Sequence, residues 1–257
     1  MISDKAIVDK NSKLESSVEV GPFSIIGKEV KVGKNTKILS HVTITGDTSI
    51  SDECEIYSFA SLGSTPQDLK FKGEKTKLII GKKNKIREYV TINPGTEHGG
   101  GITTIGDNCL FMISSHIAHD CKIGNNVIIA NNVAIAGHVE IDDNVIIGGN
   151  SAVQQFTRIG KLAMIGGMTG VEKDVIPYGL VIGNRSHLDG INIIGLKRAG
   201  YSSEEINALN QAVKLIFSNT LLKKGIEESK KFSNFKTVCD VISFLEKSEK
   251  RPICRPL

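Results

Sequence analysis

Three of the six histidines in this chain of 257 residues stand close together in two short segments. Residues 115–121 read SHIAHDC and contain His116 and His119, and residues 136–138 read AGH and end at His138. Imidazole is the side chain whose charge changes near neutral pH, so it commonly serves as a general acid or base. The first segment also holds Asp120, a carboxylate that can orient the neighbouring imidazole. The group favours acid–base chemistry, although each histidine taken singly fits a polar residue at a surface turn.

These histidines lie within a six-residue repeat that covers most of the chain. Large apolar residues recur every six positions over residues 2–62, 80–92 and 105–171, and small or β-branched residues stand four positions after each. Six is a multiple of the strand period of two and not of 3.6, so the repeat predicts short strands. Gly, Asn and Asp follow the large apolar residue, as in residues 123–126 (IGNN), and tolerate the positive φ of tight corners. Stacking such units gives a parallel β-helix with coils about 4.8 Å apart.

The repeat resembles that of the hexapeptide-repeat proteins, in which three hexads form one coil of a left-handed triangular prism. The resemblance implies an all-β, left-handed parallel β-helix, a handedness that periodicity alone does not predict because left-handed crossovers are rare. With three hexads per coil, Gly137 lies directly over His119, and Gln155 lies over Gly137. His119, Gly137, His138 and Gln155 then share one outer face across three coils, with His116 at the preceding corner.

The same resemblance leaves a second interpretation of the histidines open. Zinc-dependent carbonic anhydrases share this prism and bind their metal through three histidines. The spacing between His116 and His119 differs from the longer separation in those enzymes, and no second acidic or cysteine ligand converges on the cluster. We therefore expect neither a metal nor another cofactor.

Two interruptions of the repeat predict loops that leave the prism, at residues 63–78 and 98–104. The first loop contains QDLK at residues 67–70 and three further lysines, and loops inserted into a rigid solenoid often carry binding function. Later in the chain the pattern becomes helical, because SSEE at residues 202–205 is a capping box and apolar residues follow it at helical spacing. We expect a β-helix domain at residues 1–187 and an α-helical appendage at residues 188–257.

The composition is that of a soluble globular protein, with 40% hydrophobic and 23% charged residues. A formal net charge of +4 permits an acidic partner but is small for a nucleic-acid-binding protein. No run approaches the roughly 20 apolar residues of a membrane span, and no signal peptide is recognisable, so we expect a cytoplasmic protein without stable membrane insertion. Cys54, Cys109 and Cys121 occupy the small repeat position, which predicts core residues rather than ligands or disulfide partners.

Longer motifs extend the resemblance from the fold to one family. They are QDLKFKGE at 67–74, IREYVTI at 86–92, SHIAHDC at 115–121, AGHV at 136–139, GNR at 183–185 and INIIGLKR at 191–198. These motifs are similar to those of the UDP-N-acetylglucosamine O-acyltransferases of lipid A biosynthesis. The resemblance spans nearly the whole chain, and both loops interrupt the repeat where the loops of that family do.

The resemblance implies a role for each matching residue. His119 would be the general base, Asp120 would orient it, and the Gly137 N–H would stabilise the oxyanion. Gly167 matches the position that measures the acyl chain, where glycine leaves the groove open, although it could be only a corner residue. The residues implied in holding the sugar and phosphates are Gln67, Asp68, Lys70, His116, His138 and Gln155. Asn192 and Arg198 would contact the nucleotide or the carrier-protein end.

The implied reaction transfers a 3-hydroxyacyl chain from acyl carrier protein to the 3-hydroxyl of UDP-N-acetylglucosamine, in a homotrimer with sites between subunits. Transfer to a 3-amino UDP-sugar and a catalytically silent scaffold remain alternatives. The sequence departs from well-known members at Gln154, where histidine is frequent, at Ile194, where glutamate is frequent, and at Ala199, which replaces an arginine. The last two departures concern the nucleotide contacts.

Overall fold

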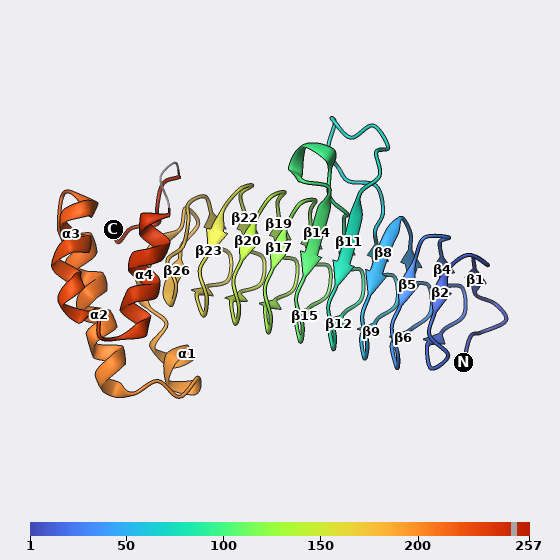
Figure 1. The fold of residues 1–257 in the computed structure, drawn as a ribbon, viewed down its shortest axis with the longest axis horizontal. Helices are drawn as coiled ribbons and strands as arrows, with labels where there is room; N and C mark the ends of the chain where they lie inside the picture. Colours follow the sequence, from blue (N-terminus) through green and yellow to red (C-terminus); the bar gives the residue numbers. More distant parts are fainter. Residues whose placement is uncertain (248–250) are drawn as a thin grey trace.

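The computed structural model describes residues 1–247 and 251–257 as an elongated prism with helices at one end (Figure 1). The N-terminus lies at the opposite end, and the chain winds along the prism towards the helices. Apart from the last strand, each strand pairs in parallel with a strand one coil away, for example His116 with Ala134, eighteen residues on. The parallel β-helix predicted from the repeat, and the left hand that the resemblance implies for it, are confirmed.

Three sheets form the sides of the prism, and most of their strands are two residues long. The first sheet consists of β1 (Ile7–Val8), β4 (Ile25–Ile26), β7 (Thr43–Ile44), β10 (Ser61–Leu62), β13 (Thr91–Ile92), β16 (His116–Ile117), β19 (Ala134–Ile135), β22 (Ala152–Val153) and β25 (Gly170–Val171). The second sheet consists of β2 (Lys13–Leu14), β5 (Lys31–Val32), β8 (Asp47–Ile50), β11 (Lys77–Ile80), β14 (Ile102–Ile105), β17 (Lys122–Ile123), β20 (Glu140–Ile141) and β23 (Arg158–Ile159). The third sheet consists of β3 (Glu19–Val20), β6 (Lys37–Ile38), β9 (Glu55–Ile56), β12 (Lys85–Ile86), β15 (Leu110–Phe111), β18 (Ile128–Ile129), β21 (Ile146–Ile147), β24 (Met164–Ile165), β26 (Gly179–Ile182) and β27 (His187–Ile191), of which β27 is antiparallel.

The core is a column of side chains inside the prism. Ile117, Ile135 and Val153 lie one above another and are buried, as the hexad register predicts. The cysteines at the small repeat position are core residues too, and Cys121 donates its thiol to the Ala136 carbonyl oxygen at 3.2 Å. Burial raises the pKa of the Cys121 thiol to about 12, so it stays protonated and unreactive.

Three corners join the sheets, and they differ in what they carry. At the first corner, between the first and second sheets, Asp120, His138 and Phe156 have positive φ values of 60°, 61° and 65°. Both loops leave the prism at this same corner, the first between β10 and β11 and the second between β13 and β14. They project together from one side of the prism (Figure 1).

The second loop lies earlier in the chain than the predicted residues 98–104. It follows β13 and contains the short 3-10 helix η1 (Glu97–Gly99), and β14 already begins at Ile102. The predicted end of the loop is too late because β14 has four residues, whereas a strand of the repeat usually has two. The two extra residues of β14 begin at Ile102, which pairs with Lys77 of β11.

The C-terminal segment is helical, as expected, with α1 (Ile193–Arg198), α2 (Ser203–Ser218), α3 (Leu222–Ser229), η2 (Lys230–Phe232) and α4 (Lys236–Glu246). Ser202 caps α2 by accepting the Glu205 N–H at 3.1 Å. Helix α3 was not predicted, because its residues LKKGIEES contain too few apolar positions to show a helical spacing. Within the described residues, no helix has the length and apolar character needed to span a membrane.

Candidate active site

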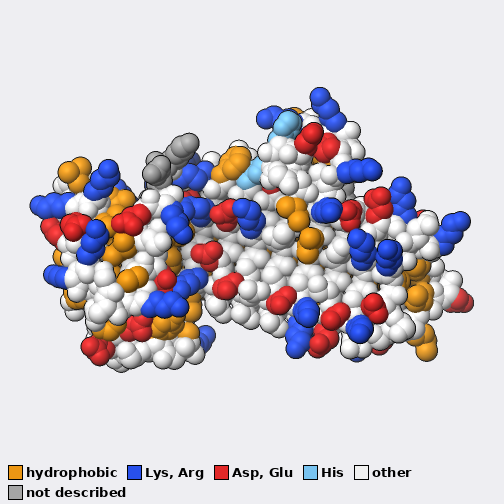
Figure 2. Space-filling view, viewed as in Figure 1, with side chains coloured by type: hydrophobic (Ala, Val, Ile, Leu, Met, Phe, Trp, Pro, Cys, Tyr) orange, Lys and Arg blue, Asp and Glu red, His pale blue; other side chains and the backbone are white. Residues whose placement is uncertain are grey.

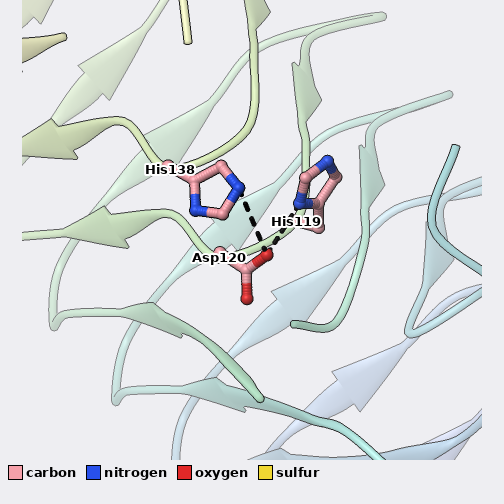
Figure 3. A group of neighbouring side chains, drawn as sticks. All are labelled: His119, Asp120 and His138. Carbon is pink, nitrogen blue, oxygen red and sulfur yellow. Dashed lines mark hydrogen bonds and ion pairs between the residues drawn. The ribbon is translucent and has the colours of Figure 1, made fainter. Parts of the chain in front are cut away.

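His119 and Asp120 stand together at the first corner. The positive φ of Asp120 turns its side chain back under the corner, and its N–H donates to the Thr103 hydroxyl at 2.8 Å. The Nδ1 atom of His119 lies 2.7 Å from Asp120 Oδ2, and Nε2 points away from the carboxylate (Figure 3). The Asp120 side chain is fully buried, whereas 14% of the His119 side chain is exposed. The pair thus has a buried carboxylate behind an accessible imidazole, which suits a general base.

The Asp120 carboxylate is held by a residue that the sequence analysis missed. Thr96, in the second loop, donates its N–H to Oδ1 at 2.8 Å and its hydroxyl to Oδ2 at 2.6 Å. The sequence gives only a weak indication of this role: Thr96 stands three residues before a glycine, in the segment that follows the end of the repeat at Ile92. With His119, these donors satisfy both oxygens of the carboxylate.

Gly137 lies directly over the His119 ring, as the coil arithmetic predicts. A Cβ atom at this position would stand 2.6 Å from His119 Cε1, so any side chain here would push the imidazole away. The Gly137 carbonyl accepts the Phe156 N–H at 3.1 Å. Its own N–H meets no acceptor within the part of the chain that the structure describes. A backbone donor beside the base is therefore available to a ligand.

His138 completes the cluster from the next coil. Its Nε2 lies 3.8 Å from Asp120 Oδ2, its ring meets that of His119 edge-on at 5.1 Å, and Phe156 stacks on it at 4.4 Å. Burial is the main reason that the pKa of His138 is lowered; His119 adds to this, while Asp120 and Asp68 oppose it. Phe156 was not predicted, because a phenylalanine has no acid–base or metal-binding group that would single it out in the sequence.

His116 lies in strand β16 and not at a corner, so its predicted position needs correction. Strand residues alternate in direction, and Ile117 takes the inward place, which leaves His116 on the outer surface of the first sheet. Its Nδ1 lies 2.7 Å from the Thr91 hydroxyl oxygen. Burial lowers the pKa of His116, and nearby His119 lowers it further. Within the described residues, His119, Asp120 and His138 are the ones whose ligand atoms come within 4.8 Å of one another, and His116 is not among them.

The two loops touch each other above this cluster. Glu97 donates its N–H to Glu74 Oε1 at 3.3 Å, and Asn93 donates its side-chain amide to the Ser64 carbonyl oxygen at 3.1 Å. The negative charge of Asp68 lies near enough to His138 to raise the pKa of its imidazole, against the effect of burial. Gln67 and Lys70 are exposed on the same loop.

A family model described as "Udp N-acetylglucosamine O-acyltransferase; Domain 2" matches residues 174–254, and a bacterial transferase hexapeptide model of six repeats matches residues 102–137. The acyl-[acyl-carrier-protein]–UDP-N-acetylglucosamine O-acyltransferase of Thermodesulfovibrio yellowstonii is 46% identical over 256 residues, which cover 99% of each chain. The protein of the same name from Rickettsia canadensis is 51% identical over 255 residues, covering 98% of this chain and 97% of that one. The chain belongs to the UDP-N-acetylglucosamine O-acyltransferase family.

Solved structures agree over the whole length. The UDP-N-acetylglucosamine O-acyltransferase of Moraxella catarrhalis has a TM-score of 0.95 at 41% identity and covers 99% of both chains. The Acinetobacter baumannii structure has a TM-score of 0.94 at 43% identity, covering 98% of this chain and 99% of that one. The resemblance inferred from the motifs is thus confirmed, and this member of the O-acyltransferase family is an acyltransferase.

Other residues matched to this family lie away from the His119 corner within one chain. Asn192 and Arg198 border an apolar groove of about 890 Å³ along the second corner, which joins the second and third sheets, and along the outer surface of the third sheet. The Asn192 side chain caps α1, accepting the Gly195 N–H at 2.9 Å and donating to the Leu162 carbonyl oxygen at 2.9 Å. Arg198 is exposed. Ile194 and Ala199, two of the departures from the family pattern, line the same groove and make it more apolar.

Gln155 and Gly167 occupy corners. Gln155 is exposed at the first corner, one coil beyond Gly137. Gly167 lies at the third corner, between the third and first sheets, three residues after Met164 of the apolar groove. A Cβ atom at Gly167 would stand 3.2 Å from the Gly149 carbonyl oxygen, so a side chain fits after a small shift.

Proposed function

We propose that this protein transfers a 3-hydroxyacyl chain from acyl carrier protein to the 3-hydroxyl of UDP-N-acetylglucosamine, the first step of lipid A biosynthesis. Relatives of 45% to 52% identity over nearly the full chain carry the name of this reaction. The observation that carries the proposal is the His119–Asp120 contact of 2.7 Å beside the unpaired N–H of Gly137. A base and an oxyanion donor side by side are what acyl transfer needs.

In the proposed reaction, His119 Nε2 takes the proton of the sugar hydroxyl as its oxygen attacks the thioester carbonyl. The Gly137 N–H stabilises the oxyanion of the tetrahedral intermediate, where negative charge develops. Asp120 accepts the His119 Nδ1–H and stabilises the imidazolium. When the intermediate collapses, the C–S bond breaks, and the imidazolium returns its proton to the thiolate of the carrier. The products are an ester of the sugar and a free carrier thiol.

The hydroxyl acceptor is favoured over a 3-amino sugar. The relatives compared above are named O-acyltransferases, which make esters. A hydroxyl needs a base to remove its proton during attack, and we assign that role to His119. We therefore keep the ester as the product and treat the amide as an outcome of the assay below.

The donor set of the histidine cluster supports a metal-independent reaction. Asp120 Oδ1 accepts the Thr96 N–H, and Oδ2 accepts both the Thr96 hydroxyl and the His119 Nδ1–H. A metal ion bound at Asp120 would therefore compete with three hydrogen-bond donors for the lone pairs of the carboxylate. We propose that the cluster works through proton transfer alone.

We further propose that the protein is a homotrimer with the sites between subunits. The outer surface of the second sheet is charged and carries Lys13, Lys31, Lys122, Glu140 and Arg158. That of the first sheet is uncharged, apart from His116 beside the site: it begins with the exposed Ile7 and Ile25 and continues with the smaller Thr43, Ser61, Thr91, Ala134 and Ala152. At the third corner, which joins the first and third sheets, exposed rings stack 5.0 Å apart in the order Phe23, His41, Phe59 and Tyr89. If the first sheet of one subunit packs on the third sheet of the next, the uncharged first sheet and the rings at the third corner are covered, and the charged second sheet stays exposed.

This packing would bring the two halves of the site together. The His119 corner lies at one edge of the first sheet, and the groove of Asn192 and Arg198 lies along the third sheet. We propose that His116, His138, Gln155, Gln67, Asp68 and Lys70 hold the sugar and phosphates. Asn192 and Arg198 of the neighbouring subunit would contact the nucleotide or the carrier end.

The acyl carrier protein would approach a basic region around the loops. Figure 2 shows lysine and arginine side chains around the projecting loops; the first loop carries Lys70, Lys72 and Lys75, and Lys77 begins strand β11 beside it. Basic side chains steer an acidic partner to its docking place. The cytoplasmic location expected from the sequence remains a prediction.

The decisive experiment supplies purified protein with a panel of 3-hydroxyacyl carrier proteins and with UDP-N-acetylglucosamine or its 3-amino counterpart. Mass spectrometry should find an ester of UDP-N-acetylglucosamine and free carrier thiol. An amide formed only from the amino sugar would replace the acceptor in our proposal. No acylated product with either sugar would leave the silent scaffold as the better account.

A further inference from the structure

The second loop closes over the buried carboxylate of Asp120. Thr96 contributes two of the three hydrogen bonds to this carboxylate, at 2.8 Å and 2.6 Å, and is itself 2% exposed. Its hydroxyl shares Oδ2 with His119 Nδ1, so the atom that orients the base also receives a donor from the loop. Gly99 covers the carboxylate from the same loop, and a Cβ atom there would overlap the Asp120 carboxylate.

Thr96 is held in place by the loop's own backbone. Its carbonyl oxygen accepts the Gly99 N–H at 3.0 Å and the Gly101 N–H at 2.8 Å. Gly95 donates its N–H to the Lys77 carbonyl oxygen at 3.1 Å, which anchors the loop to strand β11. The N–H, the hydroxyl and the carbonyl group of Thr96 are therefore all hydrogen-bonded. The N–H and the hydroxyl both donate to the Asp120 carboxylate.

We propose that Thr96 is a positioning residue for the His119–Asp120 pair, acting through the Asp120 carboxylate. This inference rests on the proposed function. The Thr96 N–H and hydroxyl fix the carboxylate plane, so that Oδ2 stays aimed at His119 Nδ1. The hydroxyl also takes up part of the negative charge on Oδ2, which limits how strongly that oxygen binds the imidazolium.

Two effects follow from removing the hydroxyl in Thr96→Val. The carboxylate loses a donor and becomes freer to turn, so kcat should fall about tenfold to a hundredfold, as for a lost hydrogen bond to a charged group. The remaining contact between Oδ2 and protonated His119 becomes stronger, so the acidic limb of the pH profile of kcat/KM should move to higher pH. Asp120→Asn removes the negative charge and should move the same limb to lower pH. If Thr96 had a purely structural role, the acidic limb of Thr96→Val would stay at the pH of wild type.

The experiment measures kcat/KM against pH and the ¹H–¹⁵N resonance of the His119 imidazole in each variant. Thr96→Ser keeps a hydroxyl and should restore the pH profile and most of kcat. The matched control is Thr36→Val, another buried threonine whose hydroxyl donates to the Ser51 carbonyl oxygen at 2.9 Å, far from the site. It should leave both readouts unchanged, even if the protein is less stable.

An unchanged pH profile and an unchanged imidazole resonance in folded Thr96→Val would overturn the proposal. If Thr96→Val does not fold, Gly99→Ala tests it, because the added methyl displaces the carboxylate and should also lower kcat and shift the resonance. The imidazole resonance separates this inference from the proposed function, since it is read without substrate. Wild-type protein that makes no acylated sugar would refute the function, while the resonance would still decide the role of Thr96.

Discussion

The Nδ1 atom of His119 lies 2.7 Å from Asp120 Oδ2, in a contact that buries the carboxylate and leaves the other imidazole nitrogen accessible. The order of the two groups matters, because a carboxylate behind the ring fixes the tautomer with the proton on Nδ1. The lone pair of Nε2 is then directed outwards, next to the N–H of Gly137.

Replacing His119 by Ala should lower kcat by at least about a hundredfold, since a general base typically contributes that much or more. The fold should persist, because the ring lies outside the hydrophobic column and little core packing is lost. The matched control is His98→Ala, which removes an exposed histidine from the tip of the second loop. Near-normal turnover in a folded His119→Ala protein would refute the mechanism.

The burial of His138 should make stability depend on pH. In the unfolded chain its imidazole has the ordinary pKa of about 6.5, whereas burial lowers the pKa in the fold. Between the two values the unfolded state binds more protons, so stability falls as the pH drops through this window and is unaffected above it. The fall in Tm from about pH 7.5 to about pH 5.5 should be smaller for His138→Gln than for wild type. Exposed His98→Gln should behave like wild type, and an identical fall in all three proteins would show that His138 does not contribute.

Much of this geometry could be predicted because the coil has a fixed length. Eighteen residues separate Gly137 from His119, and that spacing alone places the glycine over the ring. The buried column of Ile117, Ile135 and Val153 follows from the same arithmetic. Within the repeat, position in the sequence determines both the coil and the direction of the side chain.

Thr96 and Asn192 mark the limit of this reasoning. Thr96 lies where the repeat stops, so no period sets its direction, and its partner Asp120 is 24 residues away. Asn192 belongs to a family motif that implies a ligand contact, yet its amide caps α1 and donates to the prism. One side chain can hold a helix in place and still line a groove, and a motif does not separate the two roles.

The oligomeric state should follow from the character of the sheet surfaces. Light scattering should give wild-type protein a mass three times the 27.8 kDa of one chain. Thr43→Arg places a charge on the uncharged outer surface of the first sheet and should lower both this mass and the activity, because the proposed sites lie between subunits. Ser49→Arg adds the same charge to the outer surface of the second sheet and should remain trimeric and active. Wild-type protein of single-chain mass that is fully active would contradict the shared site.

Chelation should leave activity intact, because an ion at Asp120 would have to compete with the three hydrogen-bond donors that hold the carboxylate. Turnover would be measured after prolonged dialysis against a strong chelator, with elemental analysis of the active protein showing no stoichiometric zinc. Loss of activity that returns on adding zinc would support the metal interpretation of His119, Asp120 and His138.

The last prediction concerns the length of the acyl chain. Gly167 lies at the third corner, three residues after Met164, which lines the apolar groove together with Ile128 and Ile146, and we propose that the acyl chain ends beside this glycine. We expect this open end to accept long 3-hydroxyacyl chains. In Gly167→Met the Cβ atom meets the Gly149 carbonyl oxygen at 3.2 Å, which needs only a small shift, and the rest of the side chain would occupy the end of the groove. Each methylene group that loses its place costs about 0.8 kcal/mol, so a difference of a few carbons changes selectivity by orders of magnitude.

The measurement is kcat/KM for Gly167→Met and wild type across the panel of carrier proteins. The variant should prefer shorter chains while its KM for the UDP-sugar stays unchanged, because the proposed sugar site lies at the His119 corner. Gly149→Ala, one coil below Gly167 at the same corner, tests whether any added side chain has this effect. Its methyl group would meet the Asn131 carbonyl oxygen at 3.3 Å and is too short to fill the groove, so its profile should match that of wild type. A folded Gly167→Met protein with an unchanged profile would make Gly167 a corner residue only.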